Sequence, residues 1–175
     1  MFNKLFPDIY YDSTYHIDFQ SYYDKGYRGI IFDIDNTLVP HDAPADDRSI
    51  KLISELKEIG FQVLFLSNNK EPRVKMFNDA VHCTYIYKAH KPSASGYEKA
   101  MKKMGTDKDT TMSVGDQIFT DVWGARNAGI LSVMVKYMNP KERLQIILKR
   151  RLEWIILKCY KSYCKKEGKD FILTK

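Results

Sequence analysis

The sequence has little cysteine: three residues, Cys83, Cys159 and Cys164, in a chain of 175. An odd number without a pairing pattern argues against a disulfide framework and fits a reducing compartment. None of the four histidines stands with a cysteine or another histidine at zinc-finger spacing, which argues against a structural zinc site.

Long apolar runs are also missing. No stretch reaches the roughly 18 consecutive apolar residues of a membrane span, and residues 1–15 lack the apolar core of a secretory signal. These absences predict a cytoplasmic protein that does not span a membrane. The length is enough for one domain with a substantial core.

Positive charge is scarce in most of the chain and abundant at its end. Residues 1–140 hold 17 Lys/Arg against 18 Asp/Glu, a net charge of −1, whereas residues 141–175 hold 11 against 4, a net of +7. A uniformly basic protein would indicate a nucleic-acid partner, which we do not expect here. A near-neutral body with a basic tail predicts a tail that docks on a surface.

Apolar runs and turn residues predict strands that alternate with helices. The expected strands are 28–33, 61–67, 84–89, 111–116 and 130–136, and the expected helices are 18–26, 46–60, 72 to about 80, 93–105, 119–129 and 141–166. This alternation predicts a Rossmann-like, three-layer α/β/α domain with a parallel sheet. We expect an N-terminal arm (1–27), a main α/β domain (28–138) and a basic amphipathic helical tail (139–175).

Polar residues follow the carboxyl ends of four expected strands: Asp33 and Asp35, Ser67 and Asn68, Lys91, and Asp116. In a parallel sheet these ends meet at one edge, where ligands bind. Carboxylates gathered there repel one another unless cations join them. Lys91 supplies one positive charge, and oxygen ligands without histidine or cysteine favour Mg²⁺ for the rest.

The spacing of Asp33 and Asp35 adds a chemical expectation. In an extended segment, residues two apart point to the same side. One carboxylate can then attack a phosphorus atom, while the other gives a proton to the leaving oxygen and takes one from water. Together with a cation at the same edge, this arrangement predicts phosphoryl transfer.

Four ordered motifs resemble those of the haloacid dehalogenase superfamily of phosphatases. The first, DxDx(T/V), matches DIDNT at 33–37; the second, a Ser or Thr ending the next strand, matches Ser67; the third, a lysine, matches Lys91; the fourth, GDxxxTD, matches GDQIFTD at 115–121. The resemblance covers residues 28–136.

This resemblance implies a role for each matching residue. Asp33 is the expected nucleophile, and Asp35 the general acid and base, with its backbone carbonyl on the metal. Thr37 supports the loop, Ser67 and the Asn68 amide hold the phosphoryl oxygens, and Lys91 neutralises nucleophile and phosphate. Asp116 is the expected direct magnesium ligand, and Asp121 acts on the metal or its waters.

A finer resemblance links FDIDNTLVP and GDQIFTDVWGARNAG to subclass IIIA, which includes phosphatidylglycerophosphate phosphatases. Family members often carry a cap domain, but 38–60 and 69–90 leave no room for one. An uncapped, open site suits a bulky substrate, such as a lipid headgroup, a macromolecule or a large phosphoester, because a small metabolite is usually enclosed to exclude water.

Apolar residues of the tail fall on one helical stripe: Leu144, Leu148, Leu152, Ile155, Cys159 and Tyr163. A basic amphipathic helix that also carries Trp154 can lie at an anionic membrane, in peripheral contact. The alternatives are that the stripe packs on the domain or pairs with another chain.

Three functions remain open from the sequence. The preferred one is Mg²⁺-dependent phosphomonoester hydrolysis through an aspartyl-phosphate, with a lipid phosphate such as phosphatidylglycerophosphate as substrate. The second is a soluble phosphatase for a sugar phosphate, nucleotide or phosphoprotein. The third, a binding or scaffold protein on the same fold, is opposed by the intact Asp33 and Asp35 pair.

Overall fold

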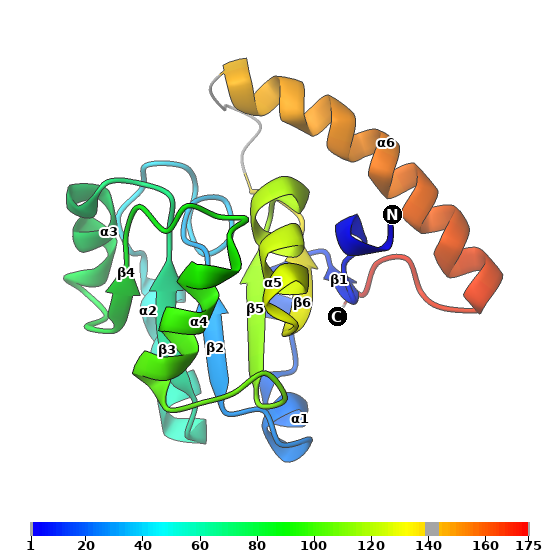
Figure 1. Cartoon of the computed structure of the whole chain (residues 1–175). Coiled ribbons are helices and arrows are strands. Elements are labelled where there is room, and N and C mark those ends of the chain that lie inside the picture. The colour runs from blue at the N-terminus through cyan, green and yellow to red at the C-terminus, as the bar shows by residue number, and fades with distance from the viewer. Residues whose placement is uncertain (1, 139–143, 175) are drawn as a thin grey trace.

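A six-stranded parallel sheet forms the centre of the molecule (Figure 1). The computed structural model describes residues 2–138 and 144–174. The strand order is β1-β6-β5-β2-β3-β4. The strands are β1 (Ile9–Tyr11), β2 (Gly29–Phe32), β3 (Gln62–Leu66), β4 (Thr84–Ile86), β5 (Thr111–Gly115) and β6 (Leu131–Val135).

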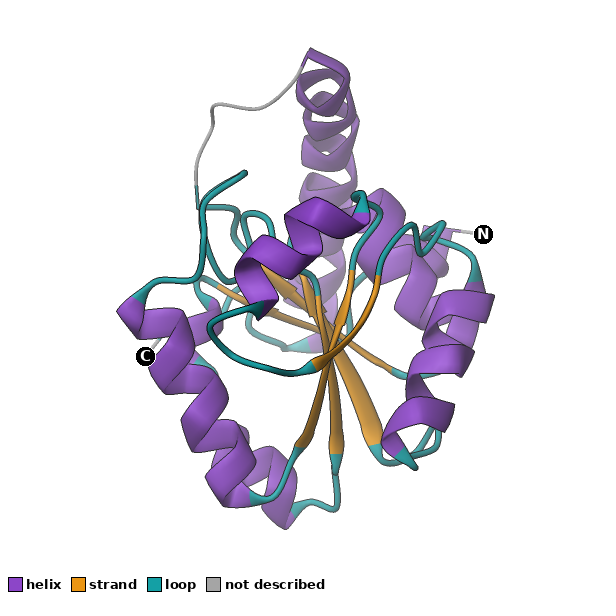
Figure 2. Ribbon diagram, turned by 90° about the vertical axis from the view of Figure 1, so that its left-hand side faces the viewer, coloured by secondary structure: helices purple, strands orange, loops and turns teal. Residues whose placement is uncertain are grey.

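Helices cover both faces of this sheet (Figure 2). On one face α1 (Phe19–Asp24), α2 (Asp47–Ile59) and α3 (Glu71–Asn78) pack on side chains that include Phe32 and Phe65. On the other face α4 (Ala94–Met104) and α5 (Trp123–Ala128) pack on Ile31 and Leu64. A π-helix, η3 (Ile118–Val122), leads directly into α5. The predicted three-layer α/β/α architecture is confirmed.

Local signals in the sequence set the helix boundaries. The Asp46 side chain accepts a hydrogen bond from the backbone N–H of Ser49 and caps α2, and Ser93 caps α4 in the same way. Both helices end at a glycine in the left-handed region, Gly60 with φ 112° and Gly105 with φ 68°. The predicted ranges for these helices are therefore confirmed to within one residue at each end.

The central strand β2 fixes the position of the site. All four of its residues are buried, as expected for a strand covered on both faces. It pairs with β3 on one side and with β5 on the other. The carboxyl ends of these three strands therefore lie side by side, directly before Asp33, Ser67 and Asp116.

The N-terminal arm contributes a strand that the sequence did not reveal. β1 pairs with β6 in parallel register, and Asp8 N donates to Ser132 O at 3.0 Å. On its other side, Leu173 N donates to Tyr10 O at 2.8 Å. A three-residue strand is too short to produce a recognisable period among tyrosines and aspartates, so five strands were expected where six are present.

The tail forms one long helix, α6 (Leu144–Glu167), beside the β1 edge of the sheet (Figure 1). Among residues 151–167, its buried side chains are Glu153, Ile156, Tyr160 and Cys164, and the three apolar ones pack against Ile118, Val122 and other residues of a third core cluster. The stripe predicted from the sequence lies on another face: its members Leu152, Ile155, Cys159 and Tyr163 are exposed. The side chains of Leu144 and Leu148 lie outside the described residues.

No inserted cap domain interrupts the described part of the chain. A loop joins β2 to α2, and between β3 and β4 there is only α3. The predicted absence of a cap is therefore confirmed. Among the helices that the structure describes, none combines the length and the apolar character needed to cross a membrane.

Candidate active site

The ends of the central strands surround a cavity of about 190 Å³. Its lining consists of residues from the loops after β2, β3, β4 and β5: Asp33, Asp35, Asn36, His41, Ser67, Asn68, Asn69, Lys91, Gln117 and Thr120. Of the eight predicted site residues, the cavity wall includes Asp33, Asp35, Ser67, Asn68 and Lys91. The other three, Thr37, Asp116 and Asp121, are buried and do not line it.

The Lys91 ammonium joins two carboxylates. Its Nζ lies 2.7 Å from Oδ1 of Asp33 and 2.6 Å from Oδ1 of Asp121. The Lys91 side chain is only 4% exposed and that of Asp33 is 12% exposed. One buried lysine therefore holds the first and fourth motifs together.

Burial shapes the ionisation of these groups. Loss of water raises the pKa of Asp33 from 3.8 to about 7, although the Lys91 charge opposes this, and the charges of Asp121 and Asp35 add to the rise. The pKa of Lys91 is raised despite its burial, because Asp121 and Asp33 stabilise the ammonium. Lys91 is therefore a permanent cation of the site.

Three carboxylates gather at the base of the cavity. Oxygens of Asp33, Asp116 and Asp121 all lie within 4.8 Å of one another, and Thr37 Oγ1 donates to Asp116 Oδ1 at 3.4 Å. When all three are ionised, Lys91 balances one of three negative charges and leaves two. This oxygen-only set, with a charge of −2, suits a hard divalent cation.

Gly115 allows the fourth motif to fold back on itself. A Cβ at this position would lie 2.4 Å from Cβ of Asp121, far inside van der Waals contact. The absence of a side chain lets Asp121 pack against the end of β5, where its Oδ2 accepts from Gln117 N at 3.0 Å. The glycine of GDQIFTD is thus required by packing.

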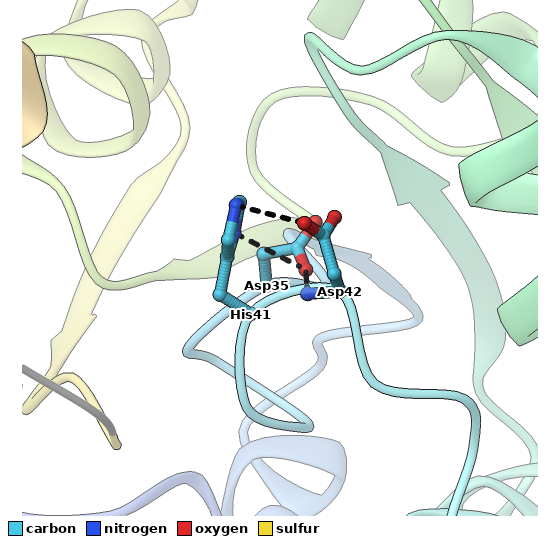
Figure 3. A group of neighbouring side chains, drawn as sticks. All are labelled: Asp35, His41 and Asp42. Carbon is cyan, nitrogen blue, oxygen red and sulfur yellow. Dashed lines mark hydrogen bonds and ion pairs between the residues drawn. The ribbon is translucent and has the colours of Figure 1, made fainter. Parts of the chain in front are cut away.

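Asp35 is held by residues that the sequence analysis did not identify. Arg73 donates to Oδ1 through Nη2 at 2.9 Å and Nε at 3.2 Å, and Asn69 Nδ2 donates to Oδ2 at 2.7 Å. His41 and Asp42 lie beside the same carboxylate, with Asp42 N donating to Oδ1 at 2.8 Å (Figure 3). Asp35, His41 and Asp42 could also group around a metal ion, but Arg73 already supplies a cation there.

The side chain of Asn68, the residue after Ser67, binds the backbone of Lys91. Its side-chain amide accepts from Lys91 N at 2.8 Å and donates to Lys91 O at 3.1 Å. This pair of bonds fixes the backbone that carries Lys91. Ser67 Oγ accepts from Asn69 N at 3.1 Å, which orients the hydroxyl at the cavity wall.

The N-terminal arm holds the loop of the first motif. Thr14 Oγ1 donates to Thr37 O at 2.7 Å, and Tyr15 OH donates to Leu38 O at 2.5 Å. Thr14 is 1% exposed. These bonds link residues 23 positions apart, so no local sequence pattern indicates them.

Comparison with known proteins places this geometry in a family. Residues 41–129 match the haloacid dehalogenase-like hydrolases. The probable phosphatase YqeG of Bacillus subtilis (strain 168) is 35% identical over 163 residues, which is 92% of this chain and 95% of that protein. Phosphatidylglycerophosphate phosphatase 1, chloroplastic/mitochondrial, of Arabidopsis thaliana is 27% identical over 87% of this chain but only 47% of its own length.

Solved structures share the fold. The cobalt-bound form of the deoxy-D-mannose-octulosonate 8-phosphate phosphatase of Haemophilus influenzae aligns with a TM-score of 0.53 over 77% of this chain and 89% of that one, at 16% identity. The family match and the 35% identity to the Bacillus protein show the family that the four ordered motifs indicated. The chain belongs to the haloacid dehalogenase-like hydrolases, among the phosphatases of that family.

Proposed function

We propose that this phosphatase hydrolyses phosphomonoesters through an aspartyl-phosphate on Asp33, with Mg²⁺ held by Asp33, Asp116 and Asp121 and by the backbone carbonyl of Asp35. The observation that carries the proposal is the cluster of three carboxylates beside a small cavity, two of which, Asp33 and Asp121, are bridged by Lys91. When bound, the metal would neutralise the phosphate oxygens and make the phosphorus more electrophilic.

Each protein group then has a task. Asp33 attacks the phosphorus and forms the P–O bond while the bond to the leaving oxygen breaks. Asp35, oriented by Arg73 and Asn69, gives its proton to that oxygen and later takes one from the water that attacks the phosphoenzyme. Lys91 and the Ser67 hydroxyl, with the backbone amide of Asn68, bind the phosphoryl oxygens.

Asp33→Asn tests the nucleophile, because asparagine keeps the shape and removes the attacking charge. We expect the variant to lose more than about 10³-fold of the phosphate release from 4-nitrophenyl phosphate. Asp24→Asn, an exposed change on α1, is the control and should leave the rate unchanged. An Asp33→Asn variant as active as the wild type would overturn the proposal.

The metal is tested separately. The chelated enzyme should be inactive, and Mg²⁺ should restore it in the wild type. Isothermal titration of Mg²⁺ into Asp116→Asn should show weakened binding without reference to activity. Full activity in chelator would contradict the metal assignment.

For the substrate, we propose a lipid phosphate, such as phosphatidylglycerophosphate. The outward face of α6 supports this: Leu152, Trp154 and Ile155 are each more than half exposed, and Lys158 lies over the Trp154 ring at 3.6 Å. An apolar surface surrounded by basic side chains favours peripheral binding at an anionic membrane. The partial resemblance to the plant enzyme points in the same direction.

The lipid proposal is tested with the full chain, because α6 contributes buried residues to the third core cluster. Leu152→Ser combined with Ile155→Ser should reduce sedimentation with anionic vesicles and hydrolysis of lipid phosphate, and should leave hydrolysis of soluble aryl phosphate unchanged. Met76→Ser, a change at an exposed apolar residue on α3, is the control. A screen in which soluble sugar phosphates, nucleotides or phosphopeptides are preferred would favour the soluble alternative.

A further inference from the structure

Glu153 is the one buried charged residue of α6 among residues 151–167. It is 3% exposed, although its neighbours Arg151 and Trp154 face solvent. Its Oε1 accepts a hydrogen bond of 2.7 Å from the backbone N–H of Ile118, 35 positions earlier in the sequence. A buried carboxylate with this contact needs an explanation beyond packing.

The donor of this bond matters because Ile118 is the first residue of η3. The first N–H groups of a helix have no acceptor within it and need one from elsewhere. The residue before η3, Gln117, provides no side-chain cap. Two carboxylates supply what is missing: Asp121 accepts from Gln117 N, and Glu153 accepts from Ile118 N.

These two bonds fix the segment that reaches the reaction centre. Gln117 and Thr120 line the cavity with Asp33. Asp121 lies in the same turn and holds Lys91, which in turn holds Asp33. A continuous set of contacts therefore runs from the tail helix through η3 to the nucleophile.

Apolar packing reinforces the connection. Ile156 and Tyr160, one and two turns after Glu153, pack with Ile118 and Val122 of η3. The helix that presents the exposed face with Leu152 and Ile155 is thus the helix that supports the fourth motif.

We propose that Glu153 is a positioning residue, through which α6 sets the placement of Asp121 and Lys91 against Asp33, so that catalysis depends on the docking of the tail. This positioning requires a side chain at residue 153 that carries a hydrogen-bond acceptor and is long enough to reach Ile118 N. This inference rests on the proposed function, since it uses the roles given there to Asp33, Lys91 and Asp121.

Three substitutions at one position test it in the full chain with 4-nitrophenyl phosphate. Glu153→Gln keeps the length and an acceptor oxygen and should stay within about threefold of the wild-type kcat. Glu153→Asp keeps the charge but is one methylene shorter, and Glu153→Ala has no acceptor. Both should lose tenfold or more in kcat, with a smaller change in KM, at temperatures well below their Tm.

Two controls separate positioning from general loss of stability. Glu167→Ala removes an exposed carboxylate of the same helix and should change nothing. Cys164→Ala weakens the packing of α6 and should lower Tm without the same loss of kcat. Hydrogen exchange of the Ile118 backbone amide should be faster in Glu153→Asp and Glu153→Ala than in the wild type, and should remain slow in Glu153→Gln.

The outcomes are distinguishable. A folded Glu153→Ala enzyme with wild-type kcat overturns the inference, and so does an Asp variant that matches or exceeds Gln. If the Ala variant does not fold, the comparison of Asp with Gln decides. Failure of the proposed function would appear instead as a wild-type enzyme that is insensitive to Asp33→Asn.

Discussion

Arg73 donates two hydrogen bonds to one carboxylate oxygen of Asp35: Nη2 lies 2.9 Å and Nε 3.2 Å from Oδ1. The two side chains are each 10% exposed, so little water competes for the contact. A guanidinium presents its donors in a rigid planar arrangement, which fixes orientation as well as charge. The proposed acid and base is therefore positioned from α3, an element outside the four motifs.

The first prediction follows from this contact. Arg73→Gln should release the Asp35 carboxyl and weaken proton transfer to the leaving oxygen. An alkyl leaving group needs that proton, whereas 4-nitrophenolate leaves without it. We expect kcat to fall by about 100-fold for an alkyl phosphate and by less than about 10-fold for 4-nitrophenyl phosphate.

Lys75→Gln, on the exposed side of the same helix, serves as the control for this comparison. Equal losses for the two classes of substrate would mean that Arg73 does not act through proton transfer.

The second prediction concerns pH and the metal-free protein. Because the pKa of Asp33 is raised to about 7 in the fold, the folded protein keeps a proton there that the unfolded chain releases near pH 4. This contribution to stability is complete below pH 4 and is lost as the pH rises through 7.

In chelator, the Tm of the wild type should therefore fall by a few degrees relative to Asp33→Asn between pH 5 and 8. Thermal melts at several pH values measure this difference. Mg²⁺ at pH 8 should raise the Tm of the wild type more than that of the variant. A difference in Tm that does not vary with pH would contradict the assigned shift.

The third prediction tests whether the N-terminal arm stabilises the fold through its bond to the loop of the first motif. Thr14→Val keeps the side-chain shape but leaves the carbonyl of Thr37 without its 2.7 Å bond. We expect a loss of about 1–2 kcal/mol in the free energy of unfolding, measured by urea denaturation. Thr84→Val, an exposed change on β4, should stay within about 0.5 kcal/mol; a similar loss in both variants would show that the Thr14 bond is not responsible.

The fourth prediction concerns two glycines with different constraints. Gly105→Ala meets open space and costs only the strain of its positive φ, about 1 kcal/mol. Gly115→Ala forces Asp121 away, so we expect a cost of about 3 kcal/mol and a large loss of activity. Chemical denaturation and phosphatase assays compare the two. Comparable effects would contradict the close approach at Gly115.

Much of this structure could be predicted because the deciding signals are local. The run of buried residues in β2, the cap at Asp46 and the stops at Gly60 and Gly105 each lie within a few residues of what they determine. Polar residues at strand ends then indicated the candidate site, since a parallel sheet brings those ends together.

Other features depend on contacts that are distant in sequence. The tail has two neighbouring apolar faces, and periodicity alone does not tell whether Ile156 or Ile155 meets the domain. Arg73 and Glu153 are charged residues, and charged residues are exposed in most proteins. The sequence therefore did not predict that these two side chains are largely shielded from solvent.

The size of the cavity has a consequence for inhibition. A volume of about 190 Å³ lies below the roughly 300 Å³ at which sites for drug-sized molecules begin, so it admits a phosphoryl group and little else. Small oxyanions that mimic phosphate should therefore inhibit this enzyme, but nothing in their own structure would make them selective for it. A selective inhibitor would have to draw its affinity from the surface outside the cavity.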